Sequence, residues 1–333
     1  MLNFPNHEQL TARIIFQSHD QYRVIFADRR IQQATLAGRM QFTGTMPLIG
    51  DFVSGQPYDR DKFLITHLLP RQTYLTRAAD QQEQGLAANV TTVFITMSAN
   101  TDFSVNRLER YLTLVWNSGA APVIVLTKAD VEPELLEQRQ TEVTAAAFGV
   151  PLITTTNTVP AAIKKAFAPF LTAKTTAIFI GSSGVGKSTL LNILAATQLQ
   201  TIKSIRSGDD KGRHTTTTRN LYYLPNGAAV IDSPGLRGVG VTGSTNTSTA
   251  QSFPDIVTLA RQCRFKDCQH EAEPNCAVQA AIKRGELSQQ RLANYKRLLR
   301  ETEYTTLTSR QINAAKIKRM VGNKKNLRHR PKR

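Results

Sequence analysis

Short apolar runs separated by polar turns fill the first 72 residues of the chain. Ala12–Phe16, Tyr22–Ala27 and Phe63–Leu68 have the composition of strands, and turn glycines such as Gly50 separate such runs. About five short strands in this length predict a small barrel, with the OB-fold favoured and an SH3-like barrel as the alternative.

From Val90 the pattern changes, and apolar runs of strand length alternate with segments of helical periodicity. The predicted strands are Val90–Ile95, Pro122–Leu126, Val150–Ile153, Thr176–Ile180 and Ala228–Ile231, and the predicted helices are Leu108–Val115, Glu134–Phe148, Ala161–Phe170 and Ser188–Ala196. This alternation predicts a mostly parallel α/β domain. The Ser/Thr/Gly-rich stretch Thr242–Ser252 predicts a loop. We therefore expect three domains, at residues 1–72, 73–250 and 251–333.

The net charge of +17 is concentrated near the C-terminus. Residues 304–333 hold ten Lys or Arg and no acid, which leaves +7 (17 minus 10) for the other 303 residues. A basic tail of this density suits a polyanion such as nucleic acid or a ribosome, and a solvated solubility tail is the alternative. The first residues show no secretory signal and no run approaches 18 apolar residues, so we expect a cytoplasmic protein without a membrane partner.

One segment fits the phosphate-loop pattern G-x-x-x-x-G-K-[ST] in full. It follows the predicted strand Thr176–Ile180 and opens a helix, as such a loop must. Its residues are Gly181, Ser182, Ser183, Gly184, Val185, Gly186, Lys187 and Ser188, with Thr189 next. The glycines let backbone N–H groups close around phosphate oxygens, and Lys187 is expected to reach the β- and γ-phosphates while Ser188 ligates Mg²⁺.

Two further motifs complete a guanine-nucleotide site. Asp232 and Gly235 form D-x-x-G after a predicted strand, where the carboxylate can hold the Mg²⁺ shell and the glycine N–H can meet the γ-phosphate. Thr127, Lys128, Ala129 and Asp130 form [NT]-K-x-D, whose Asp accepts hydrogen bonds that guanine donates and adenine cannot. Taken alone, each segment could also be an ordinary turn at the end of a strand.

The order of these motifs indicates a circular permutation. In ordinary GTPases the base motif lies far downstream of the phosphate loop, whereas Asp130 here precedes Gly181 by about 50 residues. A permuted order leaves the sheet and the nucleotide pocket unchanged, but it makes the D-x-x-G segment run directly into the C-terminal region.

With this motif order, the chain resembles the ribosome small-subunit-dependent GTPase A family, a family of circularly permuted assembly factors. The matching segments are Ala87–Val90, Gly212–Thr217, Ser252–Asp255, Cys263–His270 and Glu273–Val278. The resemblance spans essentially the whole length. It implies an α/β fold: a permuted P-loop GTPase domain between an N-terminal OB-like barrel and a C-terminal zinc-binding helical domain. Two departures are Thr127 in place of the commoner Asn, and Thr154–Thr156 in place of the usual Ser-Ala loop, which leaves the second base contact open.

Three cysteines and a histidine lie close together in the C-terminal region. Cys263, Cys268, His270 and Cys276 offer a Cys₃His set, and four filled positions predict a structural Zn²⁺ rather than a catalytic one. Three buried free cysteines beside an unrelated histidine are the alternative.

The D-x-x-G motif is not followed by the Gln that usually orients the catalytic water in GTPases. Leu236 stands where many GTPases have a Gln, so another side chain must orient the water. His214 in the switch I segment is our candidate, as the family resemblance also implies, and an exposed loop histidine is the alternative. One of Thr216 or Thr217 is expected to complete the Mg²⁺ shell.

The resemblance implies a monomeric GTPase that uses GTP/GDP and Mg²⁺, binds the small ribosomal subunit and its rRNA, and couples hydrolysis to late subunit assembly and to its own release. Two other functions stay open at this point. One is an RNA-binding regulator that uses GTP as a ligand without significant turnover, and the other is an ATP-dependent kinase or ATPase.

Overall fold

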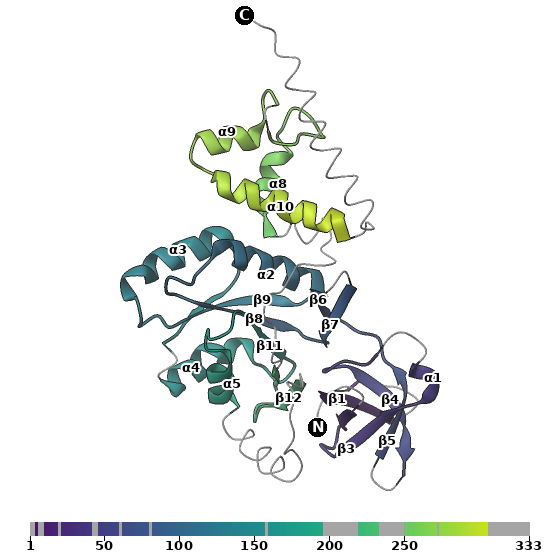
Figure 1. The fold of residues 1–333 in the computed structure, drawn as a ribbon. Helices are drawn as coiled ribbons and strands as arrows, with labels where there is room; N and C mark the ends of the chain where they lie inside the picture. Colours follow the sequence, from purple (N-terminus) through teal and green to yellow (C-terminus); the bar gives the residue numbers. More distant parts are fainter. Residues whose placement is uncertain are drawn as a thin grey trace, which may run out of the picture. The chain divides into compact units, whose positions relative to one another are not determined.

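A computed structural model gives the fold (Figure 1). It describes residues 4–5, 10–18, 21–41, 46–59, 62–79, 82–156, 159–195, 219–232, 250, 252–271 and 273–305. The chain divides into two compact units, Met1–Gly240 and Val241–Arg333.

The N-terminal strands form a closed five-stranded barrel. Its strands are β1 (Leu10–Ser18), β2 (Gln21–Ile25), β3 (Ile31–Leu36), β4 (Phe52–Tyr58) and β5 (Lys62–Leu68), with the short helix α1 (Gly38–Gln41) between β3 and β4. They follow the order β1-β2-β3-β5-β4, and β4 pairs back onto β1. The pairing of β3 with β5 is parallel, whereas the other four are antiparallel. This Greek-key connectivity confirms the OB-like barrel and excludes the SH3-like alternative.

The α/β part is a six-stranded sheet in the order β10-β9-β8-β11-β13-β12. Its strands are β8 (Thr92–Ser98), β9 (Ala121–Thr127), β10 (Leu152–Thr154), β11 (Thr176–Ile180), β12 (Arg219–Tyr223) and β13 (Ala229–Asp232). All neighbours pair in parallel except β12, which is antiparallel to β13. The strand of the base motif thus precedes the strand of the phosphate loop along the chain, as a permuted GTPase domain requires.

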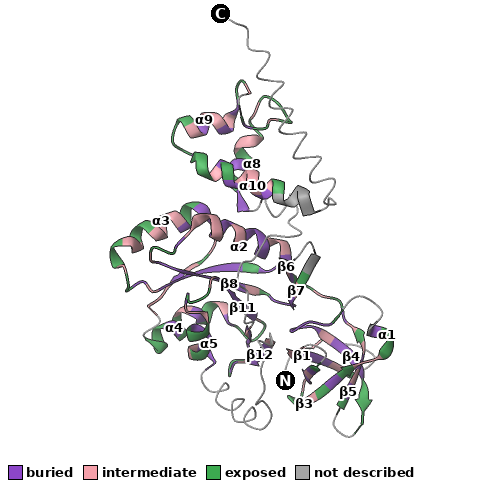
Figure 2. Cartoon of the chain, viewed as in Figure 1, coloured by how far each residue is buried: buried purple, intermediate pink, exposed green. Residues whose placement is uncertain are grey.

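Helices cover both faces of this sheet. One face carries α2 (Val105–Ser118) and α3 (Leu136–Ala146), and the other carries α4 (Pro160–Phe167) and α5 (Lys187–Leu194), as Figure 1 shows. The strands bury residues on both sides: Ile178 and Ile180 face the α2 side, and Phe179 stacks with Phe94 on the α4 side. Figure 2 shows this burial along β8 and β11. Burial on both faces explains the near-continuous apolar runs in the sequence.

Four features differ from the sequence prediction. The predicted helix Glu134–Phe148 begins as a 3₁₀ turn, η1 (Pro133–Leu135), because proline at its first position suits a tight start, and α4 likewise passes into a 3₁₀ turn, η2 (Ala168–Phe170). The hairpin β6 (Tyr74–Ala79) and β7 (Gln82–Ala88) was not predicted. Strand β12 was not predicted either.

The second unit contains helices α8 (Pro254–Ala260), α9 (Ala277–Lys283) and α10 (Gln289–Thr305) around a small apolar core that includes Phe253, Ile256 and Leu298. Arg291 on α10 forms an ion pair of 2.6 Å with Asp255 and lies over the Phe253 ring, so the segment that begins α8 is fixed to α10.

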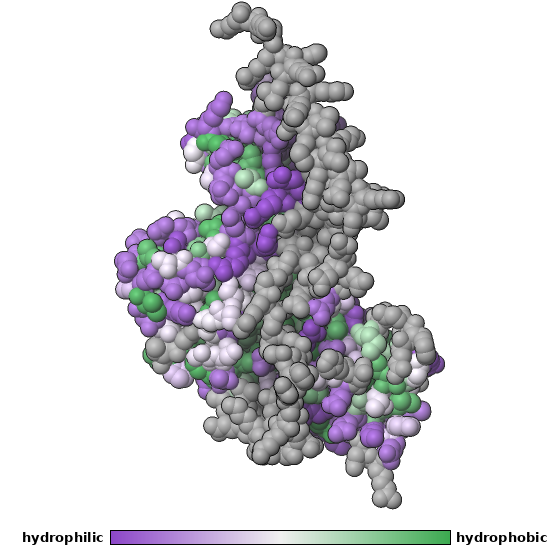
Figure 3. All heavy atoms as spheres, in the orientation of Figure 1, coloured by the Kyte–Doolittle hydropathy of each residue, from purple (hydrophilic) through white to green (hydrophobic). Residues whose placement is uncertain are grey.

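Among the described residues, no helix combines the length and apolar character needed to cross a membrane. On the face drawn in Figure 3, hydrophobic residues are scattered among hydrophilic ones.

Candidate functional site

The predicted nucleotide motifs follow strands that end at one edge of the sheet. Ile180 of β11 lies beside Ile95 of β8, and Ser98, at the end of β8, lies beside Thr127. On its other side, β11 pairs in parallel with β13, which ends at Asp232. Because the carboxyl ends of parallel strands meet at one edge, the base loop, the phosphate loop and Asp232 share the edge where open α/β sheets bind ligands.

The backbone of the phosphate loop depends on glycine. At Gly181, φ is +146°, and a Cβ atom there would lie 2.1 Å from the carbonyl oxygen of Thr96 on β8. Gly184 and Gly186 also have positive φ, of +77° and +98°. Gly186 is the N-cap of α5, so backbone N–H groups at the start of a helix form one wall of the loop, which favours an anion.

Lys187 folds back over this loop. Its Nζ donates to the carbonyl oxygens of Gly181 at 2.9 Å and Ser182 at 2.5 Å. The ammonium group therefore lies beside the loop backbone rather than in bulk solvent. Ser183, Ser188 and Thr189 are exposed, so their hydroxyl groups are accessible to a ligand.

Thr127 joins the base loop to the phosphate loop. Its side chain is fully buried, and Oγ1 lies 2.6 Å from the carbonyl oxygen of Val185, to which it donates, and 3.3 Å from that of Met97. Lys128 then takes a left-handed conformation with φ of +56°, and Asp130 ends exposed. Thr127 thus occupies the position of the commoner Asn and fixes the two loops to each other.

The segment after β10 lies against the base loop. The N–H of Thr155 donates to the carbonyl oxygen of Leu126 at 2.8 Å, and the N–H of Ala129 donates to that of Thr155 at 3.4 Å. Thr154–Thr156 therefore borders the predicted base site, where the sequence left the second base contact open.

Helix α2 supplies two residues that no motif indicated. Arg107 Nη1 donates to the Ser182 hydroxyl at 2.6 Å, and its other nitrogen contacts the backbone carbonyl of Asp102. Burial raises the pKa of Tyr111, whose hydroxyl also pairs with Ser182. These contacts support the phosphate loop from α2. Their only sequence signal is a cationic and an aromatic residue four positions apart on one helix, which is too common to identify them.

Several predicted site residues lie outside the described part of the chain. They are His214, Thr216, Thr217, Gly235 and Leu236, together with most of the predicted loop Thr242–Ser252. Their assigned roles stay predictions. Asp232, the first residue of the D-x-x-G motif, is described and pairs with Asn220 of β12.

The four predicted metal ligands come together in the C-terminal unit. The donor atoms of Cys263, Cys268, His270 and Cys276 all lie within 4.8 Å of one another. The Cys263 and Cys276 sulfurs are 3.9 Å apart, and His270 Nδ1 lies 3.6 and 3.5 Å from them. Two sulfurs bound tetrahedrally at the usual zinc distance would be separated by about 3.8 Å, so the donor set fits one zinc ion.

Electrostatics in this cluster also favours a cation. Burial raises the pKa of Cys268, and neighbouring thiols add to the effect, to about 11. At Cys263 burial opposes ionisation, but backbone N–H groups at the start of α9 outweigh it and the pKa is lowered. Burial, reinforced by Lys296, lowers the pKa of His270, so the imidazole is neutral at pH 7 and can act as a ligand. A divalent cation would offset the electrostatic repulsion between the thiolates.

Known proteins share this architecture. The family model described as RsgA GTPase matches residues 68–242. The protein named Small ribosomal subunit biogenesis GTPase RsgA 2 from Lactiplantibacillus plantarum is 45% identical over 322 residues, which cover 95% of this chain and 90% of that protein. Small ribosomal subunit biogenesis GTPase RsgA from Syntrophotalea carbinolica is 40% identical over 320 residues, covering 92% and 87%.

Two solved structures share the fold. YjeQ from Thermotoga maritima superposes with a TM-score of 0.65 at 24% identity, covering 87% of this chain and 96% of that one. YloQ, described as a circularly permuted GTPase, has a TM-score of 0.62 at 23% identity, covering 94% and 98%. The motif order, the permuted sheet and these sequence matches lead to one conclusion: this chain belongs to the RsgA GTPase family.

Proposed function

We propose that this chain binds the small ribosomal subunit, acts late in its assembly, and is released when it hydrolyses GTP. Membership of the RsgA GTPase family makes the chain a GTP-hydrolysing enzyme that uses guanine nucleotide and Mg²⁺, so the proposal concerns the partner and the timing. One observation carries it: a relative named as a small ribosomal subunit biogenesis GTPase matches 95% of this chain.

In this proposal, different residues at the sheet edge bind different parts of GTP. Backbone N–H groups of Gly181–Ser188 hold the phosphates, Lys187 contacts the β- and γ-phosphates, and Asp130 selects guanine. Ser188, Asp232 and either Thr216 or Thr217 would hold Mg²⁺, which when bound neutralises charge on the phosphates. The exposed Ser188 and Asp130 and the folded position of Lys187 support these roles.

The attacking water would be oriented by His214. A neutral imidazole can accept a hydrogen bond from water, which Leu236 cannot. Water orientation matters chiefly in the transition state, so His214→Ala should lower kcat and leave nucleotide affinity nearly unchanged. Lys187→Ala should impair both, because the ammonium contacts phosphate before and during the reaction. Single-turnover hydrolysis beside nucleotide titration separates the two, and wild-type hydrolysis by the His214 variant with small subunits present would remove the assignment.

The flanking parts would make the contact with the subunit. We propose domains at 1–72, 73–250 and 251–333, with one structural zinc in the last, and a cytoplasmic monomer whose barrel, zinc domain and basic tail bind rRNA. The OB-like barrel and the ten basic residues of 304–333 support this, since both suit a nucleic-acid partner.

The proposal is tested by GTP hydrolysis with small subunits, with large subunits, and with neither. We expect slow turnover by the protein alone and acceleration by small subunits only. Leu236 cannot orient the attacking water, and subunit binding would favour the conformation in which His214 does so. ATP in place of GTP is the control for base choice. Equal stimulation by both subunits, or none by either, contradicts the assembly role and leaves the GTPase intact.

A further inference from the structure

A buried arginine of the barrel contacts two strands of the GTPase sheet. Arg13 on β1 is 5% exposed. Its Nη2 donates to Thr176 Oγ1 at 2.7 Å, and its Nη1 donates to the Tyr223 hydroxyl at 3.2 Å. On the barrel side, Nε donates to the carbonyl oxygen of Gly50 at 3.2 Å, and the guanidinium lies 4.9 Å from the centre of the Phe52 ring.

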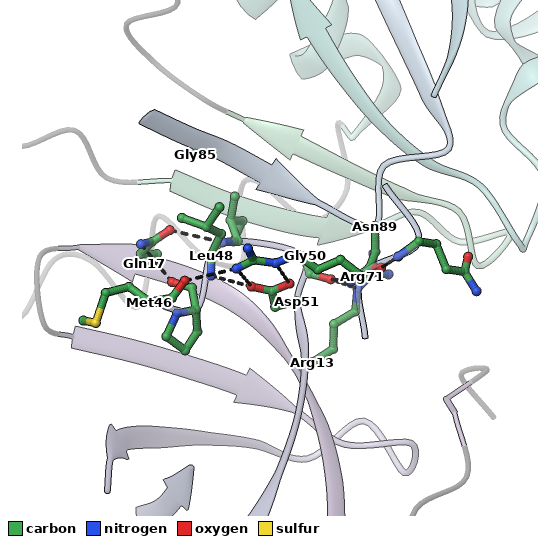
Figure 4. Close-up of polar contacts among 12 residues, drawn as sticks. Arg13, Gln17, Met46, Leu48, Gly50, Asp51, Arg71, Gly85 and Asn89 are labelled. Atoms are coloured by element: carbon green, nitrogen blue, oxygen red, sulfur yellow. Dashed lines mark hydrogen bonds and ion pairs between the residues drawn. The ribbon is translucent and has the colours of Figure 1, made fainter. Parts of the chain in front are cut away.

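A second set of contacts fixes the barrel loop that Arg13 touches (Figure 4). Asp51 is fully buried and accepts two hydrogen bonds from Arg71, at 2.9 and 2.7 Å, and one from the Leu48 N–H at 2.7 Å. Gly50 has φ of +88°, and a Cβ atom there would lie 2.3 Å from the carbonyl oxygen of Ala88. Asn89, which follows β7, donates to the same Gly50 carbonyl at 3.2 Å. These contacts tie the loop closely to the segment that leads into the GTPase domain, and only glycine fits at position 50.

Backbone pairing and packing make this junction continuous. Strand β1 pairs antiparallel with β12 at Phe16–Asn220 and Gln17–Arg219, so barrel and sheet form one eleven-stranded sheet. Buried barrel residues such as Ile14 and Phe63 belong to the same apolar cluster as Ile178 and Ile231 of the sheet. A close-packed core transmits a displacement rather than absorbing it.

The two strands that Arg13 contacts adjoin segments of the predicted nucleotide site. Thr176 begins β11, which runs directly into the phosphate loop at Gly181. Tyr223 ends β12, the first described strand after the switch I segment, and β12 pairs with the strand that ends at Asp232. We propose that Arg13 is a positioning residue of the GTPase, through which the barrel sets β11 and β12 and so conveys contact with the small subunit to the nucleotide site. This rests on the proposed function for the identity of the partner.

Three variants separate this role from mere stability of the barrel. Arg13→Gln removes the guanidinium. The double variant Thr176→Val, Tyr223→Phe removes only the acceptors on the GTPase side and keeps the shape of both side chains. Arg30→Gln is the control, because Arg30 also lies over an aromatic ring of the barrel, that of Phe26 at 5.2 Å, and forms an ion pair with Asp28 of the barrel rather than with the GTPase sheet. All three are compared by thermal unfolding first, and only folded variants proceed.

The first measurement needs no subunit. Hydrogen–deuterium exchange is followed in peptides that cover β11 and β12 of the full chain with GDP bound. We expect exchange in both strands to rise about tenfold in Arg13→Gln and less in the double variant, and to stay at the wild-type rate in the control, because hydrogen bonds to a buried charged group are lost. Exchange equal to the control in both test variants would overturn the inference.

The second measurement concerns regulation. We expect the ratio of subunit-stimulated to basal kcat to fall several-fold in both test variants, while their affinity for small subunits, measured by sedimentation with a non-hydrolysable GTP analogue, stays within twofold of wild type. The conservative variant Arg13→Lys should keep more of this ratio than Arg13→Gln does. A stimulated rate that falls only in proportion to subunit binding would also overturn the inference. If small subunits do not stimulate GTP hydrolysis by the wild-type protein, the proposed function is wrong instead. The inference about Arg13 is then tested by hydrogen–deuterium exchange alone.

Discussion

At the scale of single residues, the buried hydroxyl group of Thr127 stands where the commoner form of the predicted base motif has the amide of an Asn. Its Oγ1 is buried and hydrogen-bonded to the Val185 carbonyl of the phosphate loop. Thr127→Val keeps the shape but leaves that carbonyl without its donor, which costs about 1–3 kcal/mol. We expect weaker binding of both GTP and GDP and a lower melting temperature. Thr127→Asn, read by the same nucleotide titration, should restore most of the affinity, and a valine variant with wild-type affinity would show that the link is dispensable.

Asp130 gives a second test, of base choice. Asp130→Asn removes the acceptor that guanine needs, so GTP should bind more weakly by about 1–3 kcal/mol and xanthine nucleotides should bind better than in the wild type. Titration with fluorescent guanine and xanthine nucleotides measures both. Unchanged affinity for GTP would contradict the assignment of this loop to the base.

The sequence predicts site residues where residue type and spacing are unusual, and it does not predict those whose role depends on the fold. The phosphate loop was identifiable because its glycines and Lys187 form a rare pattern. Arg13 and Arg107 were not, because an arginine in a short strand or on a helix usually faces solvent. Only the pairing of β1 with β12 reveals that Arg13 is buried, and that pairing joins residues more than 200 positions apart.

At the scale of elements, the segment with the Cys₃His cluster is the part for which a bound metal ion should matter most. Small domains with little core take much of their folding free energy from the metal, about 10 kcal/mol or more in zinc-finger peptides. We expect one zinc per chain by plasma emission analysis, and loss of α8–α10 structure after Cys268→Ser or exhaustive chelation. GTP affinity should hardly change. Freshly purified protein without zinc, prepared free of chelator, would contradict the assignment.

Helices and strands were predictable where the local sequence carries a clear apolar pattern or a characteristic turn. Strand β11 was predicted with its observed bounds, because its last four residues are apolar and a motif glycine follows it directly. The hairpin β6–β7 was missed, since its sequences, YLTRAA and QEQGLAA, lack the Asn-Gly or Gly-rich turn that marks a hairpin. Strand β12 mixes polar and apolar residues because it is antiparallel and pairs with the barrel, a context that periodicity cannot supply.

At the scale of the whole molecule, the basic tail should govern the salt dependence of subunit binding. Deleting residues 316–333 removes nine Lys or Arg. Lost phosphate contacts should flatten the plot of log affinity against log salt by about 0.7 to 0.9 per contact. Basal GTP hydrolysis should hardly change, since the tail lies outside the nucleotide motifs. A sedimentation assay across a salt series measures the slope, and an unchanged slope would favour a solubility role.

The pairing of β1 with β12 also has a practical consequence for anyone who cuts this protein into pieces. A GTPase fragment that begins after the barrel would lose the pairing of β1 with Arg219 and Asn220, so β12 would become an edge strand. It would also uncover apolar side chains such as Leu221 and Ile231, which belong to the cluster shared with the barrel. Such edges recruit other chains. The fragment should therefore self-associate on expression, visible as oligomers in light scattering. A charged substitution on that edge, such as Asn220→Lys, should restore solubility more readily than any change in buffer.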